Sequence, residues 1–450
     1  MSFSTRQLLP HPQQQPHQEE RRHEPAAGSD APRPSRAERH RRQRTRGLVR
    51  WPRRPLVRVG AAALALATAV TVLLSAEGLL PGEPSGRRVS AGPSWNSQLA
   101  RAVGGGPSAA ASKGSKQGAA ASSTRTQTDA KVSGQLKPVL GGLLDRQKLP
   151  DKAYWSVLSG FVVQVDWSEL QAAPGAPLPP NNPIDQAIAA ARAAHLRIKL
   201  RVDAGTMAPE WVKRLGGNPI PVQFTNPVTG ELTSGTIGRF WTAAFGRAYQ
   251  DLQNKLAARY DNVPEIAQTS ITRCITFFAE PFLRQARRIP ATANALLAAG
   301  YSDTADETCQ KEQIQAAAVW KHTRSGLSFN PYQRLHPDGS VTTDEKFTEE
   351  MMRYCRAVLG ARCVLENHSI RTTSQSVWYG PMYAAIRALG GPISYQTAAP
   401  NRVGDLLGTL AWAAGQGASS VELPVSYRDL SPSALAPYNS RLLGIARTVR

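Results

Sequence analysis

The alternation of short apolar runs with helical segments constrains the fold of this chain more than any other feature. Runs rich in β-branched residues recur from residue 161 onward, beginning with FVVQVDW and LRIKLRV. The candidate strands are 161–167, 196–202, 266–278, 326–330, 362–368, 392–397 and 419–423, with a possible eighth at 153–158. Segments with helical periodicity separate most of them, at 183–194, 238–260, 306–322, 344–359, 378–389, 403–414 and 433–449.

Such alternation is typical of βαβ units on a parallel sheet. The number of units favours a (β/α)8 TIM-type barrel over a doubly wound sheet, and a barrel of this kind uses about 250 residues. No GxGxxG motif follows the first run, so the pattern does not favour a dinucleotide-binding fold. The stretch from Pro219 to Gly230 has no regular pattern, and we expect it to form a long loop.

Acidic and aromatic residues gather where the candidate strands end. Asp166 and Trp167 close the first run, Asp203 follows the second with Trp211 in the loop beyond it, and Glu280 follows the third. The C-terminal ends of the strands form the active face of a closed barrel. Aromatic rings stack on sugar rings, and paired carboxylates protonate or attack a glycosidic bond. The pattern therefore predicts a carbohydrate site.

Glycosidic bond cleavage requires two carboxyl groups, about 5 Å apart in retaining enzymes and about 6.5–9.5 Å apart in inverting ones. We expect Glu280 to be the general acid. Glu422, in SSVELP at the end of the last run, is the best candidate for the second group, and Glu366, in VLENHS, is the next. Asp166 and Asp203 are further options.

Each of these glutamates also has a structural interpretation. Glu280 would pair with a barrel arginine such as Arg201 or Arg273, and Glu422 with Arg428. For Glu366 the structural interpretation is the favoured one. The remaining candidates for contact with a substrate lie near later strand ends: Asn367, His368, Trp378, Tyr395 and Gln396. No cysteine or histidine spacing indicates a metal, and we expect no cofactor.

The order DWSEL, LRVDAG…APEW and FFAEP resembles the front half of retaining β-glycosidases of the clan that includes family 42 β-galactosidases. The resemblance covers about residues 155–285. It implies that 161–167 is strand two, that 196–202 is strand three, and that Glu280 is the general acid/base at the end of strand four. Two positions depart from the family pattern. Ala279 replaces the Asn before the acid/base, and Gln396 lies at the end of strand seven, where the nucleophilic Glu is expected.

Two functional classes follow from this resemblance and its departures. The barrel is a glycoside hydrolase that acts by carboxylate acid/base chemistry, or it is an inactive barrel that binds cell-envelope glycan. A structural envelope protein without a glycan site is a third possibility, but it leaves the strand-end aromatic residues unexplained. The sequence gives no signal for an oligomeric state.

The net charge of +21 is concentrated at the N-terminus. Residues 1–58 hold fourteen arginines against five acidic residues, whereas residues 136–450 hold thirty-three basic against twenty-five acidic residues. No nucleic-acid-binding motif accompanies this charge, so we expect no nucleic-acid partner. A basic tail beside an apolar segment is typical of a membrane topology signal.

That apolar segment runs from Val59 to Ala76 without a charge and approaches the ~20 residues that cross a bilayer. We expect a cytoplasmic tail at 1–57, a signal anchor at 58–80, a Gly/Ala/Ser-rich linker at 81–135 and an extracytoplasmic barrel at 136–450. The alternative is a cleaved leader that releases a secreted protein, and Arg53-Arg54 also resembles a twin-arginine export signal.

All four cysteines lie in the part that we expect outside the membrane. An even number of cysteines in an exported domain favours disulfides. We expect the pairs Cys355–Cys363 and Cys274–Cys309, with four buried free thiols as the alternative.

Overall fold

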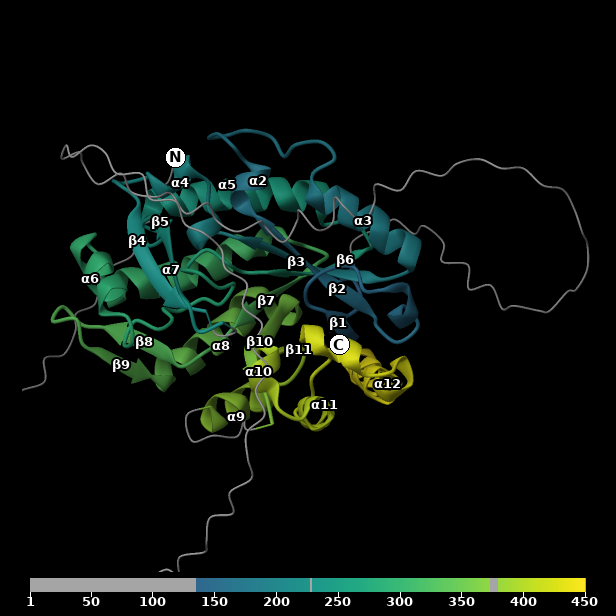
Figure 1. Cartoon of the computed structure of the whole chain (residues 1–450). Coiled ribbons are helices and arrows are strands. Elements are labelled where there is room, and N and C mark those ends of the chain that lie inside the picture. Colours follow the sequence, from purple (N-terminus) through teal and green to yellow (C-terminus); the bar gives the residue numbers. More distant parts are fainter. Residues whose placement is uncertain (1–134, 227–228, 373–378, 450) are drawn as a thin grey trace, which may run out of the picture. The chain divides into compact units, whose positions relative to one another are not determined.

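Eight parallel strands close into a barrel in the computed structural model, which describes residues 135–226, 229–372 and 379–449 (Figure 1). The neighbouring strands run in the order β1, β12, β11, β10, β7, β6, β3, β2. Their bounds are Gly142–Asp145 (β1), Gly160–Asp166 (β2), Arg197–Asp203 (β3), Ile266–Ser270 (β6), Arg324–Ser328 (β7), Cys363–Ile370 (β10), Ile393–Thr397 (β11) and Ser420–Leu423 (β12). The expectation of a (β/α)8 barrel is therefore confirmed.

Helices follow the barrel strands and cover their outer faces (Figure 1). The longer helices are α3 (Pro183–Ala194), α5 (Ala243–Tyr260), α6 (Pro290–Ala298), α7 (Asp303–Ala316), α8 (Glu345–Leu359), α9 (Gly380–Leu389), α11 (Leu406–Gly415) and α12 (Pro432–Thr448). Short helices α2 (Trp167–Leu170), α4 (Glu210–Lys213) and α10 (Pro400–Val403) lie in the connections after strands. Local signals set the helix starts: Asn182 caps α3 by accepting from the amide of Ile184 at 2.9 Å, and Pro183 occupies the first turn.

The expected tail, membrane segment and linker fall outside the described residues. Within the described ranges, no helix is both long and apolar enough to cross a membrane.

Two local expectations are wrong. The first barrel strand is β1 and not 153–158, where the chain instead forms a 3-10 turn at Lys152–Tyr154. The expected loop around Pro219–Gly230 contains an antiparallel hairpin of β4 (Ile220–Thr225) and β5 (Leu232–Ile237). A second hairpin, β8 (Tyr332–Leu335) with β9 (Val341–Asp344), lies between β7 and α8.

The third barrel run also ends earlier than expected, because β6 stops at Ser270. The amide of Ile271 still donates to the carbonyl of Gly326, but the amide of Thr272 donates to the Tyr249 hydroxyl at 3.1 Å. From this point the chain leaves the sheet and forms a loop, residues 271–289, that reaches α6. We call it the β6–α6 loop.

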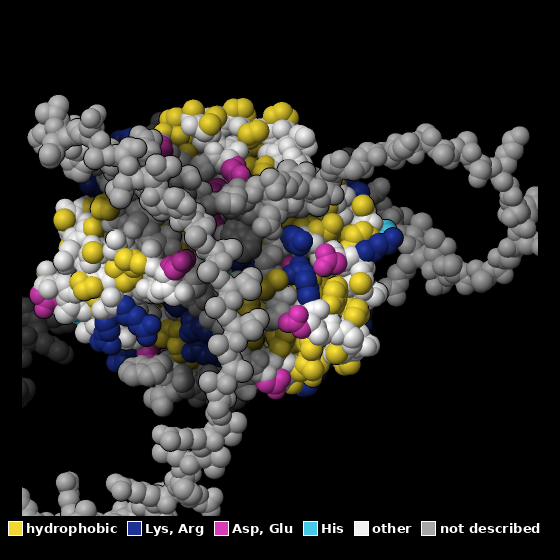
Figure 2. Space-filling view, in the orientation of Figure 1, with side chains coloured by type: hydrophobic (Ala, Val, Ile, Leu, Met, Phe, Trp, Pro, Cys, Tyr) yellow, Lys and Arg dark blue, Asp and Glu magenta, His cyan; other side chains and the backbone are white. Residues whose placement is uncertain are grey.

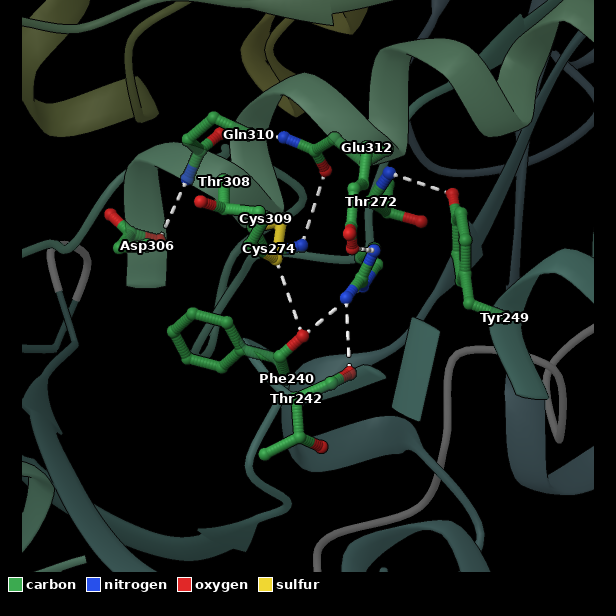
Figure 3. Close-up of a disulfide and its surroundings, with 12 residues drawn as sticks. Phe240, Thr242, Tyr249, Thr272, Cys274, Asp306, Thr308, Cys309, Gln310 and Glu312 are labelled. Carbon is green, nitrogen blue, oxygen red and sulfur yellow. Dashed lines mark hydrogen bonds and ion pairs between the residues drawn. A yellow bond between two sulfur atoms is a disulfide. The ribbon is translucent and has the colours of Figure 1, made fainter. Parts of the chain in front are cut away.

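A disulfide joins the β6–α6 loop to α7, linking Cys274 with Cys309 (Figure 3). Next to it, the Arg273 guanidinium donates to the carbonyls of Phe240 and Thr242 and forms an ion pair with Glu312 at 2.7 Å. The second disulfide, Cys355–Cys363, joins the end of α8 to the start of β10. Both expected pairings are confirmed, and the two bridges restrain the unfolded chain.

Apolar and polar side chains alternate along the barrel strands. In β3, Ile198, Leu200 and Val202 belong to the apolar core that the helices cover, whereas Lys199 and Arg201 form ion pairs with residues from opposite strands of the barrel. Successive strand residues point to opposite faces. In β3 the outward face is therefore apolar, and the inward face is charged.

Candidate functional site

The barrel interior holds a fully buried ammonium group between two carboxylates. Lys199 Nζ lies 2.8 Å from Glu366 Oε2 and 2.7 Å from Glu422 Oε1, and none of the three side chains is more than 1% exposed. Gln268 donates to the other oxygen of Glu366. Gly326 provides the room, because a Cβ at this position would lie 2.0 Å from Glu366 Oε1. Buried ions need such complete hydrogen bonding to offset their loss of hydration.

Arg201 is the next inward-facing residue of β3 after Lys199, and it binds Glu422. Its guanidinium donates to both oxygens of Glu422, at 2.9 and 3.1 Å, and to Gln396 Oε1 at 3.4 Å. Burial by itself would raise the pKa of Glu422, but Arg201 and then Lys199 lower it far below the usual range. His368 Nε2 lies 2.9 Å from Glu366, and this contact acts with Lys199 to lower the pKa of Glu366 as well. Glu422 and Glu366 are therefore ionised. We call the group Lys199, Arg201, Glu366, His368 and Glu422 the internal ion network.

Glu366, His368 and Glu422 place three possible metal-ligating atoms within 4.8 Å of one another. Lys199 already provides positive charge between the two carboxylates, within 2.8 Å of each. The arrangement fits an ion network that is neutralised by protein groups, and it does not require a cation.

Glu280 lies in the β6–α6 loop, so the expectation that it ends the fourth strand is wrong. Asn330 Nδ2 donates to Glu280 Oε2 at 2.8 Å, and Arg284 pairs with the same oxygen at 3.2 Å. The Glu280 side chain remains 12% exposed. The structural partner of Glu280 is therefore Arg284, and not Arg201 or Arg273.

Arg146 connects Glu280 electrostatically with the internal ion network. It follows β1, and its guanidinium donates to the carbonyl of Thr397, the last residue of β11, at 2.8 Å. Burial lowers the pKa of Arg146, whereas the charges of Glu422 and, more weakly, Glu280 oppose this shift. Both carboxylates thus act on one guanidinium at the C-terminal end of the barrel.

Asp166 and Asp203 end neighbouring strands and are register partners. Burial, aided by Glu169, raises the pKa of Asp166 to about 6. Burial raises the pKa of Asp203 to about 7, with Arg201 opposing and Asp166 adding to the shift. Oδ1 of Asp203 is buried and has no hydrogen-bond partner among the described residues. The pair therefore retains protons at a pH where most carboxyl groups are ionised.

Several of the expected substrate contacts are core residues instead. Trp167 is fully buried, with its ring edge-on to Trp211, Phe245 and Tyr249 at 5.8–6.2 Å, so it presents no face to a sugar. Trp211 is half-buried against the same core and donates to the carbonyl of Gln171. Aromatic character at a strand end therefore reflects packing between the strand and α5 here.

The same correction applies to β10 and β11. Tyr395 is fully buried between Tyr383 and Trp412, and Asn367 is fully buried and accepts from the Tyr383 hydroxyl. Gln396 is half-buried, lies in register with Glu422 and donates to the carbonyl of His368. Trp378 lies outside the described residues.

The sequence did not predict three charged residues of the site correctly. Lys199 and Arg146 were not predicted at all, and Arg201 was expected to pair with Glu280. The signal for Lys199 and Arg201 was present: in LRIKLRVD, the charged residues Lys199, Arg201 and Asp203 alternate with apolar ones. In a strand this spacing directs all three to one face. Arg428, which we expected beside Glu422, pairs instead with Asp145 at 2.6 Å.

Comparisons with known proteins find only distant similarity, and only to solved structures. No protein-family model and no curated protein sequence matches the chain. Among solved structures, the catalytic domain of β-amylase from Paenibacillus polymyxa matches with a TM-score of 0.44 and 10% identity, over 70% of this chain and all of the other. An endoglucanase from Pseudomonas stutzeri has a TM-score of 0.36 at 10% identity, over 64% of this chain and 85% of the other.

A GH30 endoxylanase from Clostridium papyrosolvens also matches with a TM-score of 0.36 at 10% identity, over 71% of this chain and 74% of the other. All three are carbohydrate-cleaving enzymes by their names. Similarity at this level carries no argument about the activity of this chain, and the specific resemblance to family 42 stays a prediction.

Proposed function

We propose that the domain at 136–450 is a glycoside hydrolase-like barrel that acts on a carbohydrate at the C-terminal end of its strands. The observation that carries this proposal is a pair of glutamates at the strand ends: Glu422, bound by Arg201 at 2.9 Å inside the barrel, and Glu280, held by Asn330 and Arg284 in the loop after β6. Glycosidic bond cleavage uses two carboxyl groups in different environments. Here one group is held ionised inside the barrel, and the other lies partly exposed in a loop above it.

In this proposal Glu280 is the general acid/base. Asn330 and Arg284 both hold the Oε2 atom of its carboxyl group, so proton transfer would occur at a defined position. Glu422 is the ionised partner, and it replaces the carboxylate that the resemblance expects at Gln396. The replacement is geometrically reasonable because Gln396 and Glu422 are register partners on adjacent strands and share the Arg201 guanidinium. Glu366 holds Lys199 and positions the network without reaching substrate.

One observation favours the second candidate function, a barrel that binds glycan without cleaving it. Glu422 and Glu366 are both fully buried, and Arg201 and Lys199 occupy the positions beside the Glu422 oxygens. A carboxylate enclosed in this way must exchange its partners before it can attack a sugar or activate a water. Without that exchange, the ion network shapes a binding surface.

The proposal also places the barrel outside the cytoplasm, held by the segment at 58–80. Its support is the basic tail before an apolar segment, together with two disulfides in the barrel. An extracytoplasmic barrel would meet cell-envelope glycans. A reporter that is active only outside the cytoplasm, fused after Arg450, should be active in cells, and activity of a cytoplasmic reporter alone would contradict this location.

The test of function compares the full chain with its Glu280→Gln variant on aryl glycosides and natural oligosaccharides. Loss of proton transfer should lower the rate on oligosaccharides by roughly 10²–10⁴. Aryl glycosides with good leaving groups should lose less, because they need little acid assistance. Glu349→Gln, which removes a carboxylate from an exposed pair on α8, is the matched control and should keep the wild-type rate.

The outcomes separate the two candidate functions. An equal loss on both substrate types would exclude Glu280 as the acid. Binding of glycan without turnover of any substrate would support the binding barrel and overturn the hydrolase.

A further inference from the structure

Four arginines gather on the loops that follow three barrel strands. Arg284 and Arg288 lie in the β6–α6 loop, Arg371 directly follows β10, and Arg402 lies in α10 after β11. In a parallel barrel, the segments that follow the strands all emerge at the same end. We call these four residues the arginine cluster. In the space-filling view, Lys and Arg side chains gather in the lower left of the described surface, near β8, β9 and α10 (Figure 2).

Backbone hydrogen bonds fix the segments that carry two of these arginines. The amide of Ala398 donates to the carbonyl of Ile370 at 2.7 Å, and the amide of Thr372 donates to that of Val403 at 3.2 Å. Arg371 and Arg402 are therefore held on adjoining segments. Arg284 is fixed by its ion pair with Glu280 and by a hydrogen bond with Tyr379.

The arginines act on one another electrostatically. Burial lowers the pKa of Arg402, and the charges of Arg371, Arg284 and Arg288 lower it further. Within the described ranges, Glu280 is the carboxylate that pairs with Arg284, and neither Arg288 nor Arg402 forms an ion pair with a carboxylate. Both Arg288 and Arg402 are exposed. Arg288 and Arg402 thus add exposed positive charge that no ion pair with a carboxylate of the described ranges neutralises.

We propose that the arginine cluster binds negatively charged groups of the carbohydrate, so that the substrate is an anionic glycan bearing carboxylate, sulfate or phosphate groups. This inference rests on the proposed function and names its substrate class. A guanidinium donates two parallel hydrogen bonds to a carboxylate or a phosphate, which suits it to these groups. Since Arg284 also holds Glu280, an anionic group on the cluster would lie close to the proposed acid.

Nucleic acid is the other polyanion that such charge attracts. The observations favour a glycan because the four arginines follow strands at one end of the barrel, where Arg284 contacts Glu280. The whole domain at 136–450, the cluster included, is only mildly basic, with thirty-three basic against twenty-five acidic residues. A nucleic-acid surface instead extends along a face of the protein and neutralises many phosphates in succession.

The test measures the affinity of the full chain for four polymers: dextran, polygalacturonate, dextran sulfate and duplex DNA. The variant is Arg288→Gln combined with Arg402→Gln, two exposed positions at which a neutral side chain leaves the fold intact. Arg441→Gln, on the outer helix α12, is the matched control for loss of an exposed positive charge. The basic tail is the same in every protein, so differences between variants report on the cluster alone.

We expect the double variant to lose roughly tenfold or more in affinity for polygalacturonate or dextran sulfate. Its affinity for dextran and DNA should not change, and Arg441→Gln should bind like wild type. The polymer with the larger loss identifies carboxylate or sulfate as the preferred group.

The contrary outcomes are distinct. Unchanged affinity for both anionic glycans, with dextran still bound, overturns this inference and leaves the proposed function standing. An equal loss for DNA also overturns it, because the cluster is then a general polyanion surface. No binding of any glycan by the wild-type chain refutes the proposed function itself.

Discussion

The inside of the barrel and the arginine cluster at its C-terminal end differ in how their charges are paired. Inside, Lys199 and Arg201 pair with Glu366 and Glu422, so that buried positive and negative groups balance. In the arginine cluster, Arg284 pairs with Glu280 at 3.2 Å, whereas Arg288 and Arg402 form no ion pair with a carboxylate among the described residues. The hydrogen-bonding groups of a buried, neutral ion network are already paired, so they bind a ligand weakly. Exposed groups with an excess of one charge instead attract a ligand of the opposite charge.

This difference suggests a division of labour. In the proposed function, the internal ion network keeps Glu422 ionised and fixes the positions of Glu422 and Gln396. The residues of the loops, Glu280 and the arginine cluster, would contact the substrate itself. Changes inside the barrel should therefore affect stability first, and changes in the loops should affect binding and rate.

The largest expected effect comes from breaking the balance inside the barrel. Lys199→Met leaves the fully buried Glu366 and Glu422 with one cation fewer, and it should lower the free energy of unfolding by about 3–5 kcal/mol. Lys311→Met, which breaks an exposed pair with Glu350 on the outer surface, should cost less than about 1 kcal/mol. Chemical denaturation of both variants checks this prediction, and similar small losses would show that the network is not closed to water.

A smaller effect should appear with pH at Asp203, the last residue of β3. The pKa of Asp203 is raised above its unfolded value, so the native state holds an extra proton at acidic pH. The stability contributed by this proton is complete below about pH 4 and is lost as the pH rises through about 7. Between pH 5 and pH 7 the loss should be about 2 kcal/mol.

Asp203→Asn tests this assignment, since an amide cannot titrate. The variant should lose less stability than wild type between pH 5 and pH 7, whereas Asp429→Asn, on the exposed turn before α12, should keep the wild-type pH dependence. Equal pH dependence in Asp203→Asn and wild type would show that Asp203 is ionised throughout this range.

How much of this could be predicted from the sequence depends on whether the determining contacts are local. The alternation of strands and helices was sufficient to predict the barrel, because each strand and each helix has its own hydrophobic periodicity in the sequence. The strand β1 was missed because it has four residues and is followed by no regular helix. The hairpin of β4 and β5 was missed because Pro221 lies within its first strand.

The site was less predictable because its geometry depends on contacts between distant segments. The run 266–278 is continuously apolar enough to suggest one strand, yet the Tyr249 hydroxyl and the Cys274–Cys309 disulfide draw it away from the sheet. Glu280 therefore belongs to a loop. The arginine cluster combines residues from 284 to 402, and no local pattern indicates that these segments meet.

The smallest expected effect tests the imbalance of charge in the arginine cluster directly. If Arg288 and Arg402 repel their neighbours, then Arg288→Gln with Arg402→Gln should stabilise the fold by roughly 0.5 kcal/mol at low salt. The gain should disappear near 1 M salt, where the screening length falls to about 3 Å. Arg441→Gln removes an equivalent charge from α12 and should change stability at neither salt concentration. A loss of stability in the double variant at low salt would mean that these arginines are compensated after all, and the contrast between the barrel interior and the loops would then fail. Adding an anionic glycan should stabilise the wild-type chain and leave the double variant unchanged, so that the stability difference between them disappears. That result would show that the ligand, rather than the protein, provides the missing negative charge.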